Sequence, residues 1–294
     1  MSAISRYLAP MLCTASLLVS SVSHAADNMS VIGRIQKLLD NPKTWQQIPQ
    51  SVTLCVYSPE GPRGKNFQQA LSYLSEVPKY TQMAKDLGID LSVTTINSLN
   101  YRIDVGYPKL KKKASTDVKL RVYIDERVLA EDFKANRCDG AGMSNMRARQ
   151  FNKFAGSLDA IGAILSYRQL SEAISVLARP QFESVMSNGD YEVIGMIPIG
   201  AAYIIVNDRK INTLAKAAGK KVAVFDFDKS QAQMVQRIGA QPISVDLTSV
   251  AGKFNNGEVE IMAAPALLVE PFELYKGMTG KNGETRGAII RFPI

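Results

Sequence analysis

Histidine is almost missing from this chain. The only histidine among its 294 residues is His24, and it lies in an N-terminal segment that we expect to be removed. Without histidine, neither a Ser–His–Asp nor a Cys–His catalytic site can form, and no metal site can use an imidazole ligand. The motifs Cys-x-x-Cys, Gly-x-x-x-x-Gly-Lys-Ser/Thr and Gly-x-Gly-x-x-Gly are also missing. The sequence therefore predicts no resident cofactor, and it argues against the commonest enzyme classes.

Long apolar runs are scarce as well, since only Leu8–Val22 combines length with an absence of charge. Arg6 precedes this run and Ser23-His24-Ala25 follows it, which is the order of a secretory signal peptide with cleavage near Ala25–Ala26. A membrane anchor is the alternative, although about fifteen apolar residues are few for a bilayer span. We expect an exported, periplasmic protein that cannot be a pump by itself.

Acidic residues are fewer than basic ones: the chain has 27 Asp and Glu and 35 Lys and Arg, which gives a formal net charge of +8. A basic chain can bind nucleic acid, but an exported chain seldom meets it, so we predict no nucleic-acid partner. The expected consequence of the charge is a general attraction to the anionic surface of the cell envelope.

Residues 219–265 have the pattern strand, helix, strand, helix, strand. The expected strands are short apolar runs, and the expected helices have helical spacing and end at glycine. In chain order these elements are Val222–Phe225, Gln231–Ile238, Pro242–Val245, a helix that Thr248 can cap and that ends at Asn256–Gly257, and Val259–Ala263. Such alternation indicates a mainly parallel sheet that is covered by helices.

A similar order occurs earlier in the chain. Val52–Tyr57 is an expected strand, followed by a helical stretch to Leu87 and by a strand at Leu87–Val93. A helix from about Glu126 to Asn136 then leads into Cys138–Ser144. The repetition predicts an α/β protein with two lobes of similar plan and a ligand cleft between them. A single larger α/β domain is the alternative.

Four stretches carry a resemblance to a known family. They are FKANRCDGAGMS in the first predicted lobe, and LAKAAGKKVAV, IGAQPISV and FNNGEVEIMAAP in the second. Over roughly residues 50–290 the chain resembles the periplasmic solute-binding proteins of TRAP transporters, of the dicarboxylate-binding DctP type, and it is most similar to the AdeT-type branch. The resemblance implies a two-lobed periplasmic-binding-protein fold, a small-molecule ligand and a membrane transporter subunit as partner.

Two positions depart from the pattern of that family. Typical members have an arginine near the end of the strand in GKKVAV, where it grips a carboxylate of the ligand, and this chain has Ala223. The Glu-Asn-Pro that follows the last strand in the family is replaced by Ala263-Ala264-Pro265. The resemblance therefore implies the fold but not the dicarboxylate ligand.

The layout of the family also places two cysteines in strands that we expect to be neighbours. Cys55 lies in the first strand and Cys138 opens the third. In an oxidising compartment they can form a disulfide. The alternative is that both are small buried apolar residues.

Three segments follow predicted parallel strands, at the edge where open α/β sheets bind ligands. We expect their side chains to line the cleft, and for each the alternative is a structural role: an ordinary turn, a surface ion pair for Arg147, and helix capping for Asp228. The candidate residues are Tyr57, Ser58, Glu60 and Arg63 in the first segment, Ser144, Asn145 and Arg147 in the second, and Asp226, Asp228 and Ser230 in the third.

These elements predict a domain plan. We expect a signal peptide at 1–25, an N-terminal extension at 26–49, lobe 1 at 50–195, lobe 2 at 196–265, and a return helix and hinge strand at 266–294. A long crossing strand over Tyr191–Val206 and a return strand over Gly287–Pro293 would join the lobes. The resemblance implies further helices after the return strand, so the C-terminus is expected to be truncated.

Three functions remain open from the sequence alone. The favoured one is a periplasmic solute-binding protein that is not an enzyme and that passes a small molecule to a membrane transporter. An envelope accessory protein with an efflux-pump partner is the first alternative. An exported hydrolase of the Ser–Lys type is the second.

Overall fold

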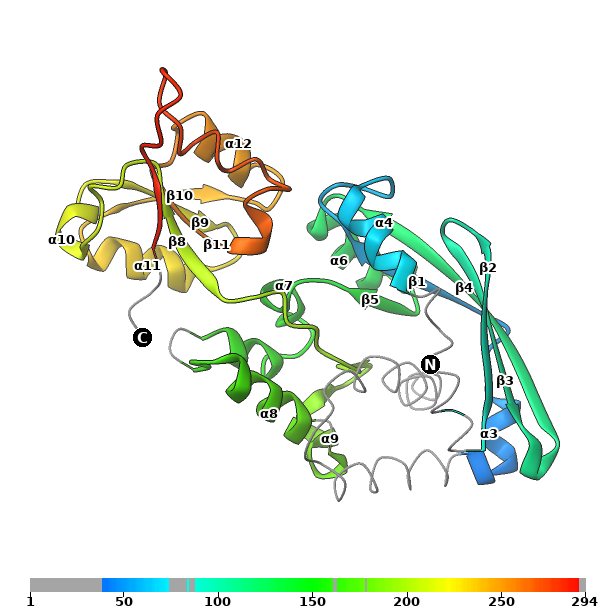
Figure 1. Cartoon of the computed structure of the whole chain (residues 1–294). Helices are drawn as coiled ribbons and strands as arrows, with labels where there is room; N and C mark the ends of the chain where they lie inside the picture. The colour runs from blue at the N-terminus through cyan, green and yellow to red at the C-terminus, as the bar shows by residue number, and fades with distance from the viewer. Residues whose placement is uncertain (1–38, 74–83, 85–87, 161–162, 178, 291–294) are drawn as a thin grey trace. The chain divides into compact units, whose positions relative to one another are not determined.

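The computed structural model describes residues 39–73, 84, 88–160, 163–177 and 179–290, and it divides into two compact units, Met1–Ile197 and Pro198–Ile294 (Figure 1). The expected signal peptide at 1–25 lies outside the described residues. The sequence predicted a boundary after residue 195, and the two units divide after Ile197. In the part of the chain that the structure describes, none of the helices has both the length and the apolar character needed to cross a bilayer.

Unit 1 is built on a five-stranded sheet with the order β2–β3–β4–β1–β5. The strands are β1 (Ser51–Tyr57), β2 (Asp90–Asn97), β3 (Asn100–Tyr107), β4 (Lys112–Tyr123) and β5 (Gly140–Gly142). β1 runs parallel to both β4 and β5, whereas β3 is antiparallel to β2 and β4. Four of the five strands therefore point the same way, and the sheet is mixed.

The antiparallel part of this sheet is a long meander that the sequence did not predict (Figure 1). Asn97 makes the first turn, since its side-chain oxygen accepts hydrogen bonds from the backbone N–H of Leu99 and the amide of Asn100. The second turn contains Lys111, which has a left-handed backbone with φ of 52°. The sequence predicted one strand, Leu87–Val93, between the helix that precedes it and the helix that begins near Glu126. This prediction was wrong for residues 100–123, which contain two further strands, β3 and β4.

The helices of unit 1 follow the strands or precede them. They are α3 (Pro42–Gln46), α4 (Lys65–Ser72), α6 (Glu126–Lys134), α7 (Asn145–Ala148), η3 (Ala155–Asp159), α8 (Tyr167–Leu177), η4 (Pro180–Phe182) and α9 (Glu183–Met186). η2 (Pro108–Leu110) lies in the β3–β4 turn, and β6 (Ser187–Asn188) pairs with β7 (Tyr191–Glu192). α3 is anchored at the end of the meander, because Trp45 stacks on the buried ring of Tyr107 with centroids 6.3 Å apart.

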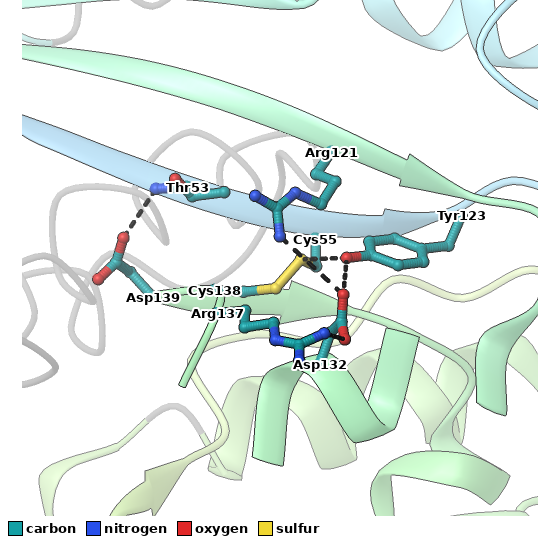
Figure 2. Close-up of a disulfide and its surroundings, with 8 residues drawn as sticks. All are labelled: Thr53, Cys55, Arg121, Tyr123, Asp132, Arg137, Cys138 and Asp139. Carbon is teal, nitrogen blue, oxygen red and sulfur yellow. Dashed lines mark hydrogen bonds and ion pairs between the residues drawn. A yellow bond between two sulfur atoms is a disulfide. The ribbon is translucent and has the colours of Figure 1, made fainter. Parts of the chain in front are cut away.

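A disulfide joins Cys55 in β1 to Cys138 just before β5, with Cα atoms 5.8 Å apart (Figure 2). This distance lies within the range that a disulfide bridge requires. Both cysteines are buried and contact Leu129 of α6. The expected disulfide and the expected pairing of the two strands both agree with the structure. The expectation that Cys138 opens the third strand was wrong, because Cys138 lies in the loop before β5, the fifth strand in chain order.

Polar contacts hold the same loop (Figure 2). The Asp139 carboxylate accepts a hydrogen bond of 2.8 Å from the backbone N–H of Thr53, and the Asp139 N–H donates to the Thr53 carbonyl. The Asp132 carboxylate accepts from the Tyr123 hydroxyl at 2.6 Å and from Arg137 at 2.7 Å. The hydrogen bond from Tyr123, followed by the charge of Arg137, lowers the pKa of Asp132. These contacts hold the three-residue strand β5 against β1 in addition to the backbone hydrogen bonds between the two strands.

Unit 2 has a sheet with the order β10–β9–β11–β8–β12. The strands are β8 (Ala202–Val206), β9 (Lys221–Phe225), β10 (Gln241–Val245), β11 (Ile261–Pro265) and β12 (Ala288–Ile290), and the helices are α10 (Leu214–Ala217), α11 (Lys229–Arg237), α12 (Val250–Asn255) and η5 (Ala266–Leu268). β9 is parallel to β10 and β11, and only β8 runs against its neighbours. The order predicted for residues 219–265 is confirmed.

The core of unit 2 forms where α12 packs on the sheet. Phe254, Leu274 and Ile205 have no exposed surface. Gly277 is required beside Phe254, because a Cβ there would lie 2.6 Å from the ring. The N-cap of α12 is Ser249 and not Thr248 as predicted. In the turn before it, the Asp246 carboxylate accepts from the N–H groups of Thr248 and Ser249.

The predicted crossing strand is wrong in its middle. Residues 193–201 have no regular structure, and only the ends of Tyr191–Val206 form strands, in β7 and β8. Pro198 has no N–H to donate to a ladder, and Gly200 has a φ of 113°. The return strand forms as β12, which pairs with β8. The rest of Gly287–Pro293 beyond β12 lies outside the described residues.

Candidate functional site

The parallel strands of unit 1 end at one edge of the sheet. Tyr57 pairs with Tyr123 across β1 and β4, and Val56 pairs with Gly142 across β1 and β5. The chain after each strand therefore leaves the sheet at the same edge, which we call the carboxyl edge of unit 1. It comprises residues 58–66, 124–127 and 143–149. Ligands of open α/β sheets bind at such edges.

Glu126, the first residue of α6, is the centre of this edge. Its side chain is 1% exposed. One carboxylate oxygen accepts a hydrogen bond from the backbone N–H of Ser144, and the other accepts from the Ser144 hydroxyl at 2.8 Å. The Nε of Arg147 lies 4.0 Å from the carboxylate, and the Arg147 side chain is 12% exposed. The start of α6 is thus tied to the start of α7 by one carboxylate.

Ser144 and Arg147 were predicted from the sequence as site residues, and Glu126 was not. The available signal was the pair Asp125-Glu126 between a strand and a helix, which is the same kind of position as Asp226 and Asp228. It was not found because the strand before it, β4, was not predicted. Asp125 caps α6, since its carboxylate accepts from the N–H of Arg127 at 2.8 Å.

Burial raises the pKa of Glu126 above its ordinary value of 4.5, while the hydrogen bonds from Ser144 and the charge of Arg147 act against the rise. The folded state then holds a proton at pH values where the unfolded chain has lost it. The free energy of unfolding of the wild type should therefore fall, relative to Glu126→Gln, as pH rises from 4.5 through the raised pKa, and should level off above it. Chemical denaturation of both proteins across this range measures the difference. A difference that grows in favour of the wild type would contradict the assignment.

Asn145 and Asp159 form a second polar group next to Glu126 and Arg147. The Asn145 amide donates to the Ala155 carbonyl at 2.7 Å. Solvent reaches Asp159, yet the surrounding protein partly desolvates its carboxyl and raises its pKa. A hydrogen bond from Asn145 and the charge of Arg149 oppose that rise. Both arginines that follow Ser144 therefore face a carboxylate.

The loop after β1 uses most of its polar groups internally. Ser58 is buried, and its hydroxyl donates to the Gly61 carbonyl at 3.2 Å. Glu60 caps α4, because its carboxylate accepts from the N–H of Asn66 at 3.1 Å. Tyr57 is half-buried and Arg63 is exposed. Of the four predicted residues, Ser58 and Glu60 therefore shape the loop, and Arg63 is the one that faces solvent.

In unit 2, Asp228 has the contacts of a helix cap, which was the alternative to a ligand-binding role. Its carboxylate accepts from the N–H groups of Ser230 and Gln231 at 3.1 and 3.3 Å, which caps α11. Asp226 and Ser230 are exposed. The departures from the family pattern are apolar here, since Ala223 packs against the core and Ala264 is buried in β11.

Replacing Asp228 with alanine should lower the free energy of unfolding by about 1 kcal/mol, since two N–H groups at the start of α11 lose their acceptor. Asp228→Asn should retain most of the stability, because asparagine is an equally good cap. Ser230→Ala is the matched control, since only the backbone of Ser230 contacts the cap. Urea denaturation measures all three. Equal stability of Asp228→Ala and the wild type would refute the capping role.

A hollow of about 390 Å³ lies elsewhere in unit 1, on the antiparallel strands β2, β3 and β4. Asp90, Asp104 and Lys113 are among its lining residues. The Ser115 hydroxyl already donates to Asp104. This hollow is remote in the sheet from the ends of β1 and β5, so we do not assign the ligand to it. Among the described residues there is no group of three Cys, Asp, Glu or His side chains that could hold a metal ion.

Comparison with known proteins identifies a family and two related proteins. The family model described as "Solute-binding protein AdeT 1/2" matches residues 9–294. "Probable solute-binding protein AdeT1" of Acinetobacter baumannii is 50% identical over 183 residues, which are 62% of this chain and 59% of that protein. "Probable solute-binding protein AdeT2" of the same organism is 34% identical over 139 residues, 47% of this chain and 56% of that protein. The matched regions thus span under two thirds of either relative.

The fold matches solved structures at low sequence identity. A TRAP periplasmic solute-binding protein from Desulfovibrio salexigens, solved with bound orotic acid, aligns with a TM-score of 0.51 and 14% identity. The alignment covers 82% of this chain and 68% of that one. At this identity the similarity establishes the two-lobed TRAP fold and says nothing of the ligand.

Proposed function

Because the chain belongs to the AdeT 1/2 solute-binding protein family, we propose that it captures a small molecule in the periplasm and delivers it to a membrane transporter subunit. The observation that carries the proposal is the carboxyl edge of unit 1. Glu126 and Ser144 meet there from two segments, and the loop after β1 leaves the sheet at the same edge, because the strands before the three segments are parallel neighbours. This is the arrangement in which α/β proteins bind ligands.

We propose that the ten candidate residues have two kinds of role, ligand contact and support of the local structure. Tyr57, Arg63, Asn145 and Arg147 in unit 1, with Asp226 and Ser230 in unit 2, supply ligand contacts. Ser58, Glu60 and Asp228 hold their segments in shape, because their side chains make hydrogen bonds within those segments. Ser144 instead ties the start of α7 to Glu126 of α6. In this role the protein performs no catalysis, and its binding energy serves capture and release.

Native mass spectrometry of the full chain, purified without denaturation from the cell envelope, tests the proposal. We expect a mass excess that corresponds to one retained small molecule and that is lost on denaturation. An empty protein that co-purifies with subunits of an efflux pump would instead support the role of an envelope accessory protein. Turnover of an ester panel would support an exported hydrolase.

A further inference from the structure

The two arginines of the segment 144–149, which is part of the carboxyl edge of unit 1, both lie near carboxylates. Arg147 lies 4.0 Å from the buried carboxylate of Glu126, and Arg149 interacts with Asp159. Each cation of the segment 144–149 therefore has an acidic counterpart within unit 1. A ligand that reaches this segment meets polar groups whose charges largely cancel.

This pairing bears on which ligands Arg147 can hold. A ligand carboxylate that approaches the guanidinium also approaches Glu126, and the repulsion offsets much of the attraction. Arg147 cannot turn away from Glu126 without cost, because a buried carboxylate would lose its cation. Ser144 adds no anion-binding capacity, since its hydroxyl and its N–H are both donated to Glu126.

We infer that the carboxyl edge of unit 1 accepts a solute without net charge, either uncharged or zwitterionic, and that Glu126 is the residue that excludes dicarboxylates. The inference deepens the proposed function and rests on it. It is independent of the alanine at position 223, because it follows from contacts within unit 1. Glu126 acts through Arg147 and Ser144, so its role is to set the charge of the site.

The substitution Glu126→Gln separates charge from shape. Glutamine has the size of glutamate and keeps an oxygen that can accept from Ser144, but it removes the negative charge that lies beside Arg147. Glu131→Gln is the matched control, since Glu131 lies on the same helix α6, its side chain is 66% exposed and it pairs only with Lys134 in the contacts recorded for the described residues. Asp159→Asn is a second variant at a solvent-exposed residue, and it removes the negative charge near Arg149.

Calorimetric titration of the full-length exported chain with succinate provides the test. We expect the wild type and Glu131→Gln to bind succinate weakly and equally, and Glu126→Gln to bind it at least about tenfold more tightly. Asp159→Asn should change in the same direction, and it keeps the test informative if Glu126→Gln does not fold. Tight succinate binding by the wild type, or variants that bind it no better, would overturn the inference. A retained solute in native mass spectrometry would still leave the proposed function standing in that case.

Discussion

Replacement of both Cys55 and Cys138 by alanine should lower the free energy of unfolding by about 4 kcal/mol. The two residues are 83 positions apart in the sequence, and a cross-link over a loop of this length restricts the unfolded chain by about that amount. Urea denaturation of the oxidised wild type and the double variant measures the difference.

Reduced wild-type protein is the control for this prediction. It should unfold at nearly the same urea concentration as the double variant, because both lack the cross-link and retain the hydrogen bonds of Asp139 and Asp132. Alkylation under native conditions should label neither cysteine of the oxidised protein. If the double variant loses less than about 1 kcal/mol, the bridge does not restrain the unfolded chain as we suppose.

Glu126→Ala should be the most damaging substitution at the candidate site, with a loss of about 3 kcal/mol. Removal of one member of a buried ion pair leaves the other charge unpaired, and this typically costs about 3–5 kcal/mol. Here Arg147 loses the carboxylate beside it, and the N–H of Ser144 also loses its acceptor. Glu126→Gln should lose about 1 kcal/mol, since an acceptor remains.

Glu131→Ala serves as the control on the same helix. Its side chain is 66% exposed, so its removal should change the free energy of unfolding by less than about 0.5 kcal/mol. Thermal and urea unfolding of the three variants rank them directly. Equal losses for Glu126→Ala and Glu131→Ala would show that the carboxylate of Glu126 does not brace α6 against α7.

Local patterns in the sequence were enough to predict the parallel core. β1, β9, β10 and β11 are short apolar runs, and α6 and α11 have helical spacing, so each is specified by neighbouring residues. The cap at Asp228 was foreseen for the same reason, because its acceptors and donors lie within three residues. The family resemblance, which is now shown for residues 9–294, supplied the arrangement of these pieces in two lobes.

The meander and the centre of the site could not be predicted in this way. β3 contains Arg102 and Asp104, and β4 contains several lysines, so neither strand is an uninterrupted apolar run. Their pairing is set by the turns at Asn97 and Lys111. Glu126 meets Ser144 across 18 positions of sequence. That contact exists only because β4 and β5 both flank β1, which is a property of the sheet order.

The central property to test is that the chain binds one solute without net charge. The direct measurement is a calorimetric titration in which the compound released from the purified protein is returned to the ligand-free chain. We predict saturable binding of one molecule per chain, a compound that is uncharged or zwitterionic at neutral pH, and an affinity that weakens when Glu126→Gln removes the negative charge beside Arg147. Absence of saturable binding, or a released compound that is a dicarboxylate, would contradict the account.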